Sequence, residues 1–163
     1  MIKILVVGLS GTIGGIETLF YGLFGEKNNY FDISFLYFTN PGAYEREFAQ
    51  NGYHIFHMES RRSNPLNFDK RVSTFFQENS SFDYVWVNTA STSMYQFQVY
   101  AKKYTSAKVI THSHGTTFDS TSGKLFYFLN KILGIFNYQK VIANTDIFFC
   151  CSRAAGIALF GEK

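Results

Sequence analysis

The stretch MIKILVVGLSGTIGGIETLFYGLF, residues 1–24, decides the fold of this chain. Its apolar run at 2–7 has the length of a strand and is followed by a glycine-rich segment at 8–15. From Ile16 onward, apolar side chains recur at i, i+3, i+4, i+7 and i+8, which is the pattern of an amphipathic helix. A strand, a glycine turn and a helix in this order direct unpaired backbone N–H groups and a positive dipole end toward an anion. Because glycine has no Cβ, a phosphate can approach that backbone closely, so the sequence predicts a phosphate-bearing ligand.

The remainder of the chain alternates in the same way. The patterns predict strands at about 2–7, 32–38, 53–57, 83–88, 107–112 and 146–150, and helices near 15–25, 43–51, 65–78, 92–104, 123–138 and 152–160. Strands that alternate with helices are typical of a parallel sheet with helices on both faces. The predicted fold class is therefore α/β, a Rossmann-like open parallel sheet, and the length fits one domain spanning 1–163.

Composition narrows the function classes. The net charge of +3 suits anionic ligands or lipid head groups and is too weak to indicate nucleic acid. The first apolar run is only strand-length and precedes no recognisable cleavage site, so it does not indicate a signal peptide. No uncharged apolar run reaches the roughly 18 residues of a membrane span. The adjacent Cys150 and Cys151 would point to opposite faces of a strand, so we expect reduced core thiols and a cytoplasmic protein.

Polar segments follow most of the predicted strands. In open α/β sheets, ligands bind beyond the carboxyl ends of the strands. The segments at those ends are rich in Ser, Thr, Asn, Gly, His and Arg, and they lie at 8–15, 38–44, 58–64, 88–93 and 112–119. No part of the sequence supplies a lid over them, which indicates that a partner domain is missing.

The sequence His112-Ser113-His114-Gly115 ends the fifth predicted strand. His112 and His114 share a face, but two histidines without a third ligand make a poor zinc site, and we expect no metal. We expect His112 to be a hydrogen-bonded structural histidine. For His114, beside a glycine in a strand-end loop, we expect contact with a sugar hydroxyl or a phosphate, because imidazole donates and accepts near neutral pH.

Arg61 and Arg62 follow the third predicted strand. Guanidinium groups bind carboxylate or phosphate oxygens in a bidentate manner, which favours a ligand-binding role. The alternative is that Arg61 and Arg62 lie in a solvated loop and bind no ligand.

An apolar stripe at helical spacing occupies the fifth predicted helix, with Lys131 and Lys140 around it. Its members are Leu125, Phe128, Leu129, Ile132, Leu133 and Phe136. An interior helix is the ordinary interpretation of such a stripe. A helix that faces a membrane surface, apolar with basic flanks, is the alternative.

A dehydrogenase is a second interpretation of the glycine spacing. It finds support in Tyr104-x-x-x-Lys108, with Ser91 upstream. Two objections weaken it. A dinucleotide site needs a carboxylate or an arginine after the second strand, and residues 33–44 contain no Asp, Glu or Arg. The tyrosine and lysine must also share a helix face, whereas Lys108 opens the fifth predicted strand.

Several blocks of this sequence resemble one family over nearly the whole chain. They are Lys3-Ile4-Leu5, Ile-Gly-Gly-Ile-Glu-Thr at 13–18, Asp-Ile-Ser-Phe at 32–35, Pro-Gly-Ala-Tyr at 41–44, Arg-Arg-Ser-Asn-Pro-Leu at 61–66, Thr-His-Ser-His-Gly-Thr at 111–116 and Cys-Ser-Arg-Ala-Ala-Gly at 151–156. The chain is similar to family-four glycosyltransferases of the GT-B fold, above all to those of capsule and exopolysaccharide synthesis.

That resemblance implies two Rossmann-like domains that face each other across a cleft. This chain corresponds to the N-terminal, acceptor-side domain, and the donor-binding C-terminal domain with its paired glutamates is absent from it. The resemblance places Gly14 and Gly15 at the donor diphosphate and His114 at the transferred sugar. It places Arg61 and Arg62, with Ser113, on the acceptor side.

The implied reaction is retaining transfer of a sugar from a nucleotide sugar to a lipid-linked or oligosaccharide acceptor, with no cofactor and no metal. The resemblance also implies a position at the inner face of the cell membrane, with peripheral contact to it. Backbone N–H groups at a helix N-terminus can stabilise the charge of a departing phosphate without a metal. The alternatives are a dehydrogenase or nucleotide-sugar epimerase that uses NAD(P), and a non-catalytic subunit that completes its site with another chain.

Overall fold

The computed structural model describes residues 1–27, 29–115 and 124–162, without the side chains of 124–126. The strands are β1 (Ile2–Leu9), β2 (Phe31–Tyr37), β3 (His54–His57), β4 (Tyr84–Thr89), β5 (Lys108–Ser113) and β6 (Ile147–Cys150). The helices are α1 (Gly15–Phe24), α2 (Glu45–Gln50), α3 (Pro65–Glu78), α4 (Gln96–Tyr104), α5 (Lys124–Ala143) and α6 (Arg153–Phe160). Each strand and helix that the sequence predicts is therefore present.

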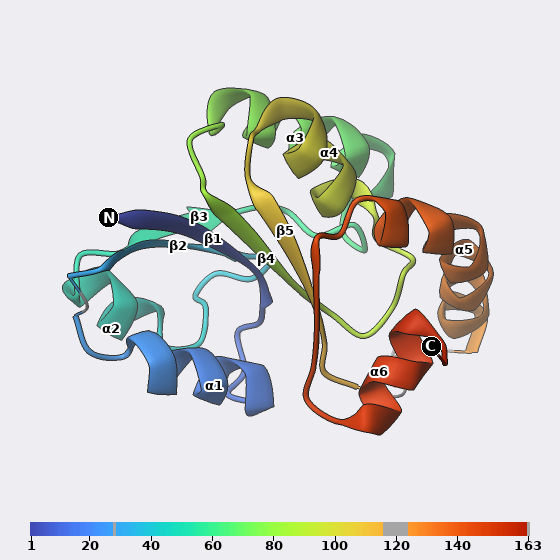
Figure 1. Ribbon diagram of the computed structural model, residues 1–163, viewed down its shortest axis with the longest axis horizontal. Helices are drawn as coiled ribbons and strands as arrows, with labels where there is room; N and C mark the ends of the chain where they lie inside the picture. Colours follow the sequence, from blue (N-terminus) through green and yellow to red (C-terminus); the bar gives the residue numbers. More distant parts are fainter. Residues whose placement is uncertain (28, 116–123, 163) are drawn as a thin grey trace.

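The strands form one parallel sheet in the order β3-β2-β1-β4-β5-β6. Figure 1 shows α1 and α2 on one face of this sheet, α3 and α4 on the other, and α5 and α6 beside its β6 end. This arrangement confirms the predicted α/β, Rossmann-like fold class. The order reverses between β1 and β4, so the carboxyl ends of these strands flank the crevice where open sheets bind ligands.

β1 is buried on both faces, as a central parallel strand should be. Val7 belongs to a hydrophobic cluster with Phe76 of α3, and its neighbour Val6 belongs to a separate cluster with Phe20 of α1. Consecutive strand residues thus supply two cores, one under each helix layer. The resulting rigidity fixes the position of the loop that leaves the end of β1.

Two boundaries differ from the predicted ones by four residues or more, and the others agree within two residues. α4 begins at Gln96 because a polar turn replaces the four residues before it: the Thr89 hydroxyl donates to the Ser91 carbonyl oxygen at 2.7 Å, and the Ser93 amide donates to the Ser91 hydroxyl at 3.1 Å. Serine and threonine side chains favour such turns over helix interiors. α5 continues to Ala143, five residues beyond the predicted end.

Two burial predictions are wrong. Cys150 and Cys151 are unbridged, as expected, but both are exposed rather than part of the core, because β6 is the edge strand of the sheet. α5 is not an interior helix, since Phe136 is 75% exposed and Ile135 is 70% exposed. None of the helices in the described ranges combines the length and the hydrophobicity that crossing a bilayer requires.

Candidate functional site

The candidate site begins where β1, β4 and β5 end side by side. Gly8 has a φ of +100°, and a Cβ at this position would lie 2.4 Å from the backbone oxygen of Asn88. Both the backbone conformation and the close approach require glycine. The chain can therefore turn toward α1 only with this residue at the end of β1.

A row of hydrogen bonds crosses the same strand ends. The Asn88 amide nitrogen Nδ2 donates to the Val7 carbonyl oxygen at 3.0 Å, which turns Oδ1 toward Nδ1 of His112, also at 3.0 Å. Because Oδ1 only accepts, Nδ1 of His112 carries the proton. Burial lowers the pKa of His112. The expectation of a hydrogen-bonded structural histidine is confirmed.

The turn into α1 is closed by a buried carboxylate. Glu17 accepts from the Ser10 amide at 2.8 Å, the Ser10 hydroxyl at 2.9 Å and the Gly14 amide at 3.1 Å. The last contact is the glutamate half of a capping box, in which the side chain at the third helical position accepts from the N-cap amide. The Gly14 amide is thus already paired, whereas Gly15 and Ile16 lie in the first helical turn, where the helix itself provides no acceptor. The space around Gly15 is open, since a Cβ there would have no atom of residues 1–27, 29–115 or 124–162 within 4 Å.

His114 lies across from this helix end. Its ring centroid is 6.1 Å from that of His112, in an edge-to-face arrangement. Burial, followed by the proximity of His112, lowers the pKa of His114 despite the opposing effect of Glu17. Its Nε2 atom is buried and has no hydrogen-bond partner among the described residues. Such an atom costs about 1–3 kcal/mol unless something binds it.

One pocket of about 510 Å³ joins these features. Its lining residues are Gly8, Ser10, Gly14, Gly15, Ile16, Glu17, Leu19, His112, His114 and Cys151. That volume is within the range of small-ligand sites. The structure therefore brings together Gly14, Gly15 and His114, which the sequence singles out from two separate segments. Cys151 also lines this pocket, a placement that only the pairing of β6 with β5 reveals.

Arg61 is engaged with the protein itself. Its guanidinium donates to the Ser93 carbonyl oxygen at 2.7 Å, to the Ser93 hydroxyl at 3.2 Å and to the side-chain oxygen of Asn130 on α5. Burial lowers the pKa of Arg61. Arg62 is exposed. The two arginines therefore face different surroundings, although they are neighbours in sequence.

Ser113 is fully buried at the end of β5. Its hydroxyl donates to the Ala155 carbonyl oxygen at 2.7 Å, and its own carbonyl oxygen accepts from the Cys151 amide at 2.9 Å. Both bonds tie β5 to the segment that leads into α6. Thr116, Thr117 and Asp119, which follow Gly115 in the sequence, lie outside the described residues.

A second pocket of about 500 Å³ lies between the β4–α4 turn, α5 and α6. It is lined by Ala90, Ser91, Thr92, Tyr127, Asn130, Lys131, Gly134, Ile135, Tyr138, Ile157, Ala158, Leu159 and Gly161. The sequence analysis missed this pocket. The available signal is the spacing of Asn130, Gly134 and Asn137, which places small and polar residues on one helix face. Arg61 does not line this pocket, but it donates a hydrogen bond to Asn130, which does.

The tyrosine and lysine of the dehydrogenase interpretation lie at the wrong edge of the sheet. Tyr104 ends α4 and Lys108 opens β5, so both are at the amino ends of the strands. Ser91 is at the other end of α4, about 13 Å of helix away. Hydrogen bonds from Ser73, Lys103 and Gln77 lower the pKa of Tyr104 to about 8, but that hydroxyl is remote from the pocket at the carboxyl edge.

No family profile and no curated protein sequence matches this chain. Solved structures share its fold. Anabaena Alr3699/HepE in complex with UDP-glucose matches with a TM-score of 0.58 and 16% identity, over 98% of this chain and 40% of that one. A UDP-N-acetylglucosamine 2-epimerase matches with a TM-score of 0.60 and 16% identity, over 99% of this chain and 46% of that one.

BdcA (YjgI) from E. coli matches with a TM-score of 0.53 and 10% identity, over 91% of this chain and 96% of that one. The present chain spans less than half the length of the first two proteins. Likeness at these identities shows the fold, and the fold is one that includes nucleotide-sugar-binding proteins.

Proposed function

We propose that this chain is the N-terminal, acceptor-side domain of a retaining glycosyltransferase that uses a nucleotide-sugar donor. One observation carries the proposal: the unpaired, buried Nε2 of His114 lies in the same pocket as the first-turn amides that follow Gly14 and Gly15. The diphosphate of such a ligand would accept hydrogen bonds from these amides, and a neighbouring sugar hydroxyl would bind Nε2 of His114. The Alr3699/HepE structure, solved with UDP-glucose, supports this ligand class.

The donor diphosphate would lie against the open side of Gly15. There the unpaired amides of the first turn and the positive end of the α1 dipole favour an anion. As the sugar leaves the phosphate, negative charge grows on the phosphate oxygens, and preorganised N–H groups stabilise it without a metal. The Glu17 carboxylate has three donors of its own, and this limits its repulsion of the ligand.

His114 would bind the transferred sugar. Its lowered pKa keeps the imidazole neutral near pH 7, so Nε2 forms one hydrogen bond without adding a charge beside the developing oxocarbenium ion. Retention of configuration is part of this proposal and follows the family resemblance.

The acceptor would occupy the side of Arg61 and Arg62, whereas Ser113, which is buried and donates to Ala155, would act there only by holding β5 to α6. Arg61 acts there as a positioning residue, because it holds Asn130 at the wall of the second pocket. We propose a lipid-linked saccharide of capsular or exopolysaccharide synthesis as acceptor, at the inner face of the cell membrane. The opposite wall of the donor site would come from a further domain or from a partner subunit.

Binding of nucleotide sugars tests this function. Saturation-transfer NMR with UDP-glucose and UDP-N-acetylglucosamine should show contact at the sugar and the ribose, and His114→Leu should weaken binding at least tenfold. His54→Leu, an exposed histidine of β3, is the matched control and should bind as the unchanged chain does.

Three results would contradict the proposal. The first is the absence of any nucleotide-sugar signal. The second is tight binding of NADH, which favours the dehydrogenase interpretation. The third is conversion of UDP-N-acetylglucosamine into free or nucleotide-linked N-acetylmannosamine, which favours an epimerase such as the structural neighbour.

A further inference from the structure

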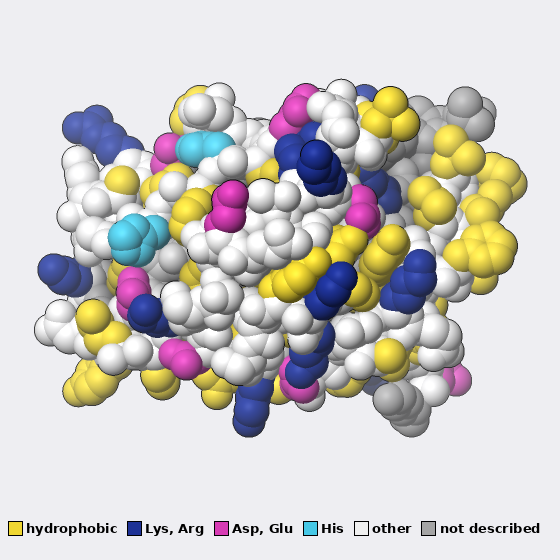
Figure 2. Space-filling view, turned by 90° about the horizontal axis from the view of Figure 1, so that it is seen from above, with side chains coloured by type: hydrophobic (Ala, Val, Ile, Leu, Met, Phe, Trp, Pro, Cys, Tyr) yellow, Lys and Arg dark blue, Asp and Glu magenta, His cyan; other side chains and the backbone are white. Residues whose placement is uncertain are grey.

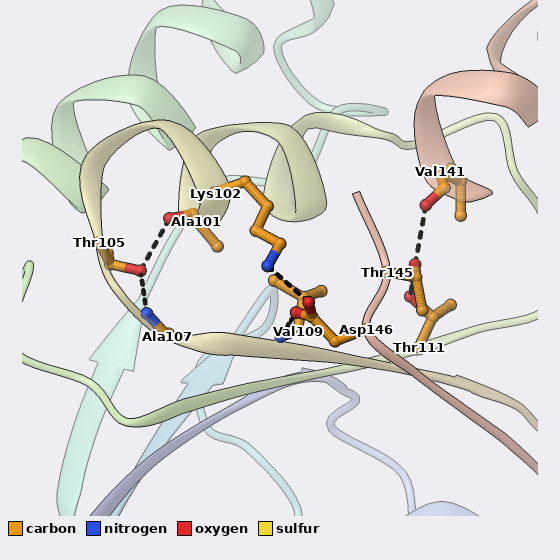
Figure 3. A network of polar contacts seen from close by, with 9 residues as sticks. All are labelled: Ala101, Lys102, Thr105, Ala107, Val109, Thr111, Val141, Thr145 and Asp146. Carbon is orange, nitrogen blue, oxygen red and sulfur yellow. Dashed lines mark hydrogen bonds and ion pairs between the residues drawn. The ribbon is translucent and has the colours of Figure 1, made fainter. Parts of the chain in front are cut away.

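His112 points to the face of the sheet that carries α1. Consecutive side chains of a strand point to opposite faces. The preceding residue, Thr111, accepts from Gln98 of α4 at 3.3 Å, and its hydroxyl lies 2.7 Å from that of Thr145, just after α5 (Figure 3). Because Thr111 is held on that side of β5, His112 is directed to the other side, into the pocket at the N-terminus of α1.

The Asn88 side chain determines which nitrogen of His112 carries a proton. The carbonyl oxygen of Val7 only accepts, so Asn88 donates to it through Nδ2 and presents Oδ1 to Nδ1 of His112. Both side chains are buried, with 4% of Asn88 and 6% of His112 exposed. Burial also lowers the pKa of His112, which favours the neutral ring. In that ring Nδ1 holds the proton, and Nε2 therefore carries a lone pair.

Aromatic rings surround the imidazole of His112 and hold it in this orientation. Their centroids lie 6.1 Å away for Trp86, 6.4 Å for Phe149 and 6.1 Å for His114, the last two in edge-to-face arrangements. Half a turn of the ring about its bond to Cβ would place a carbon atom before Asn88 and break the hydrogen bond. The lone pair of Nε2 thus has a fixed direction.

Nε2 of His112 is open to a ligand. Among residues 1–27, 29–115 and 124–162, none donates to this nitrogen, while Nδ1 is bound by Asn88. His112 lines the pocket of about 510 Å³ together with Gly15 and His114. An unpaired acceptor inside a pocket is complemented by a ligand group that donates, such as a hydroxyl.

Donors and acceptors occupy different parts of this pocket. The amides of Gly15 and Ile16 donate at the start of α1, whereas Nε2 of His112 accepts at the end of β5. The hydroxyl of Ser10 and the carboxylate of Glu17 are already bound to each other. A nucleotide sugar has the complementary order of groups, because its diphosphate only accepts and the hydroxyls of its sugar donate.

The charge of the pocket also favours a hydroxyl. Glu17 is the only charged residue among the described residues that line it. Lysine and arginine side chains lie instead at separate places on the outer surface, as Figure 2 shows for the face that carries α3 and α4. A ligand carboxylate beside His112 would therefore meet a lone pair and no lining cation, whereas a hydroxyl would form a hydrogen bond.

We propose that Nε2 of His112 accepts a hydrogen bond from a hydroxyl of the donor sugar, and that Asn88 is the positioning residue that makes this nitrogen an acceptor. This inference rests on the proposed function, because the hydroxyl belongs to the nucleotide-sugar donor. It assigns His112 a contact of its own, in addition to the contact of His114 with the same sugar.

The protonation of the ring is testable without a ligand. Long-range proton–nitrogen NMR spectra distinguish protonated from unprotonated ring nitrogens, and the His112→Phe variant identifies the signals of His112. At about pH 7.5, Nδ1 should be protonated and Nε2 should not, and Asn88→Leu should move the proton toward Nε2. Asn67→Leu, at an exposed position of α3, is the matched control and should leave these signals unchanged. A protonated Nε2 in the unchanged chain would overturn the proposal.

Binding of UDP and of UDP-glucose separates a contact with the sugar from a structural effect. His112→Phe keeps an aromatic ring beside Trp86 and Phe149 but removes the acceptor. It should weaken binding of UDP-glucose by about five- to tenfold and leave binding of UDP unchanged. Asn88→Leu should act in the same direction by a smaller factor. Thermal melts of both variants check that the fold is retained.

Analogues of UDP-glucose with one hydroxyl replaced by fluorine identify the group that donates, because fluorine cannot donate. One analogue should bind the unchanged chain more weakly than UDP-glucose does and should lose no further affinity in His112→Phe. Equal weakening of UDP and UDP-glucose in His112→Phe would assign this residue a structural role and overturn the proposal. Unaltered affinity of His112→Phe for UDP-glucose would overturn it as well and leave the proposed function standing. If the unchanged chain binds neither UDP nor UDP-glucose, the proposed function fails and this inference fails with it.

Discussion

The carboxylate of Glu17 lies 3.1 Å from the backbone nitrogen of Gly14, at the helix end where the sequence predicts an anion-binding site. The helix therefore supplies its own negative group, and that group is buried, with 4% of Glu17 exposed. A bound anion would therefore meet the amides of Gly15 and Ile16 rather than that of Gly14. The carboxylate holds the glycine loop in the shape that presents those amides.

Glu17→Ala should lower the free energy of unfolding by about 1–3 kcal/mol, because the amides of Ser10 and Gly14 lose their acceptor in a partly buried turn. Urea denaturation measures the change. Glu26→Ala removes the same charge from an exposed position just after α1 and should have little effect. Equal stability of the two variants would show that the cap is not structural.

Gly15→Val should leave the fold intact and abolish binding of nucleotide sugars. A Cβ at this position would have no atom of the described residues within 4 Å and would project into the space where the diphosphate would lie. Gly22→Val is the matched control, since it also meets open space on the same helix. Titration of UDP-glucose into both variants, followed by NMR, compares them. Unchanged affinity in Gly15→Val would refute the role of this glycine.

Gly8→Ala should lower the stability of the chain, in contrast to Gly15→Val. The positive φ and the 2.4 Å approach to Asn88 should destabilise the chain by about 2 kcal/mol or more. Two glycines of one loop should therefore respond differently, one in stability and the other in ligand binding. A thermal melt of Gly8→Ala that matches the unchanged chain would contradict this assignment.

Local patterns were enough to predict the sheet, because each strand and its following helix carry their own periodicity. In β1, for example, successive side chains belong to two different hydrophobic clusters, which is the pattern of a central strand. That the glycine segment and His114 would lie close together was also predictable, since the carboxyl ends of parallel strands meet at one edge of the sheet, and both line one pocket there. The surroundings of particular side chains were not predicted correctly.

Those failures share a cause, namely contacts between distant segments. Arg61 donates to Ser93 and to Asn130, which lie 32 and 69 residues away, and no local pattern predicts either contact. The contact with Asn130 turns α5 so that its asparagines face inward, which made the interior interpretation of its apolar stripe wrong. Cys150 is exposed because β6 ends the sheet, and strand order is a property of the whole chain.

Arg61→Ala should destabilise the chain by about 2–3 kcal/mol, because a half-buried guanidinium links the β4–α4 turn to α5 through charge-assisted hydrogen bonds. Hydrogen exchange should rise in α5 and in the turn at Ser93, and remain unchanged in β2. Arg46→Ala, at an exposed position of α2, is the control and should change stability by no more than about 0.5 kcal/mol. If both variants behave alike, Arg61 does not position α5.

Stability should fall as the pH drops below about 6.5. Burial lowers the pKa of His112 and of His114 from the ordinary value of 6.5, so the unfolded chain binds more protons than the folded chain just below that pH. Stability is therefore fully present above 6.5 and is lost as the pH falls toward the folded-state pKa values. Urea midpoints between pH 5 and 8 measure this slope. His114→Leu should reduce the slope, whereas His54→Leu, in an exposed position, should not; a slope that persists in His114→Leu combined with His112→Gln would assign the pH dependence to other groups.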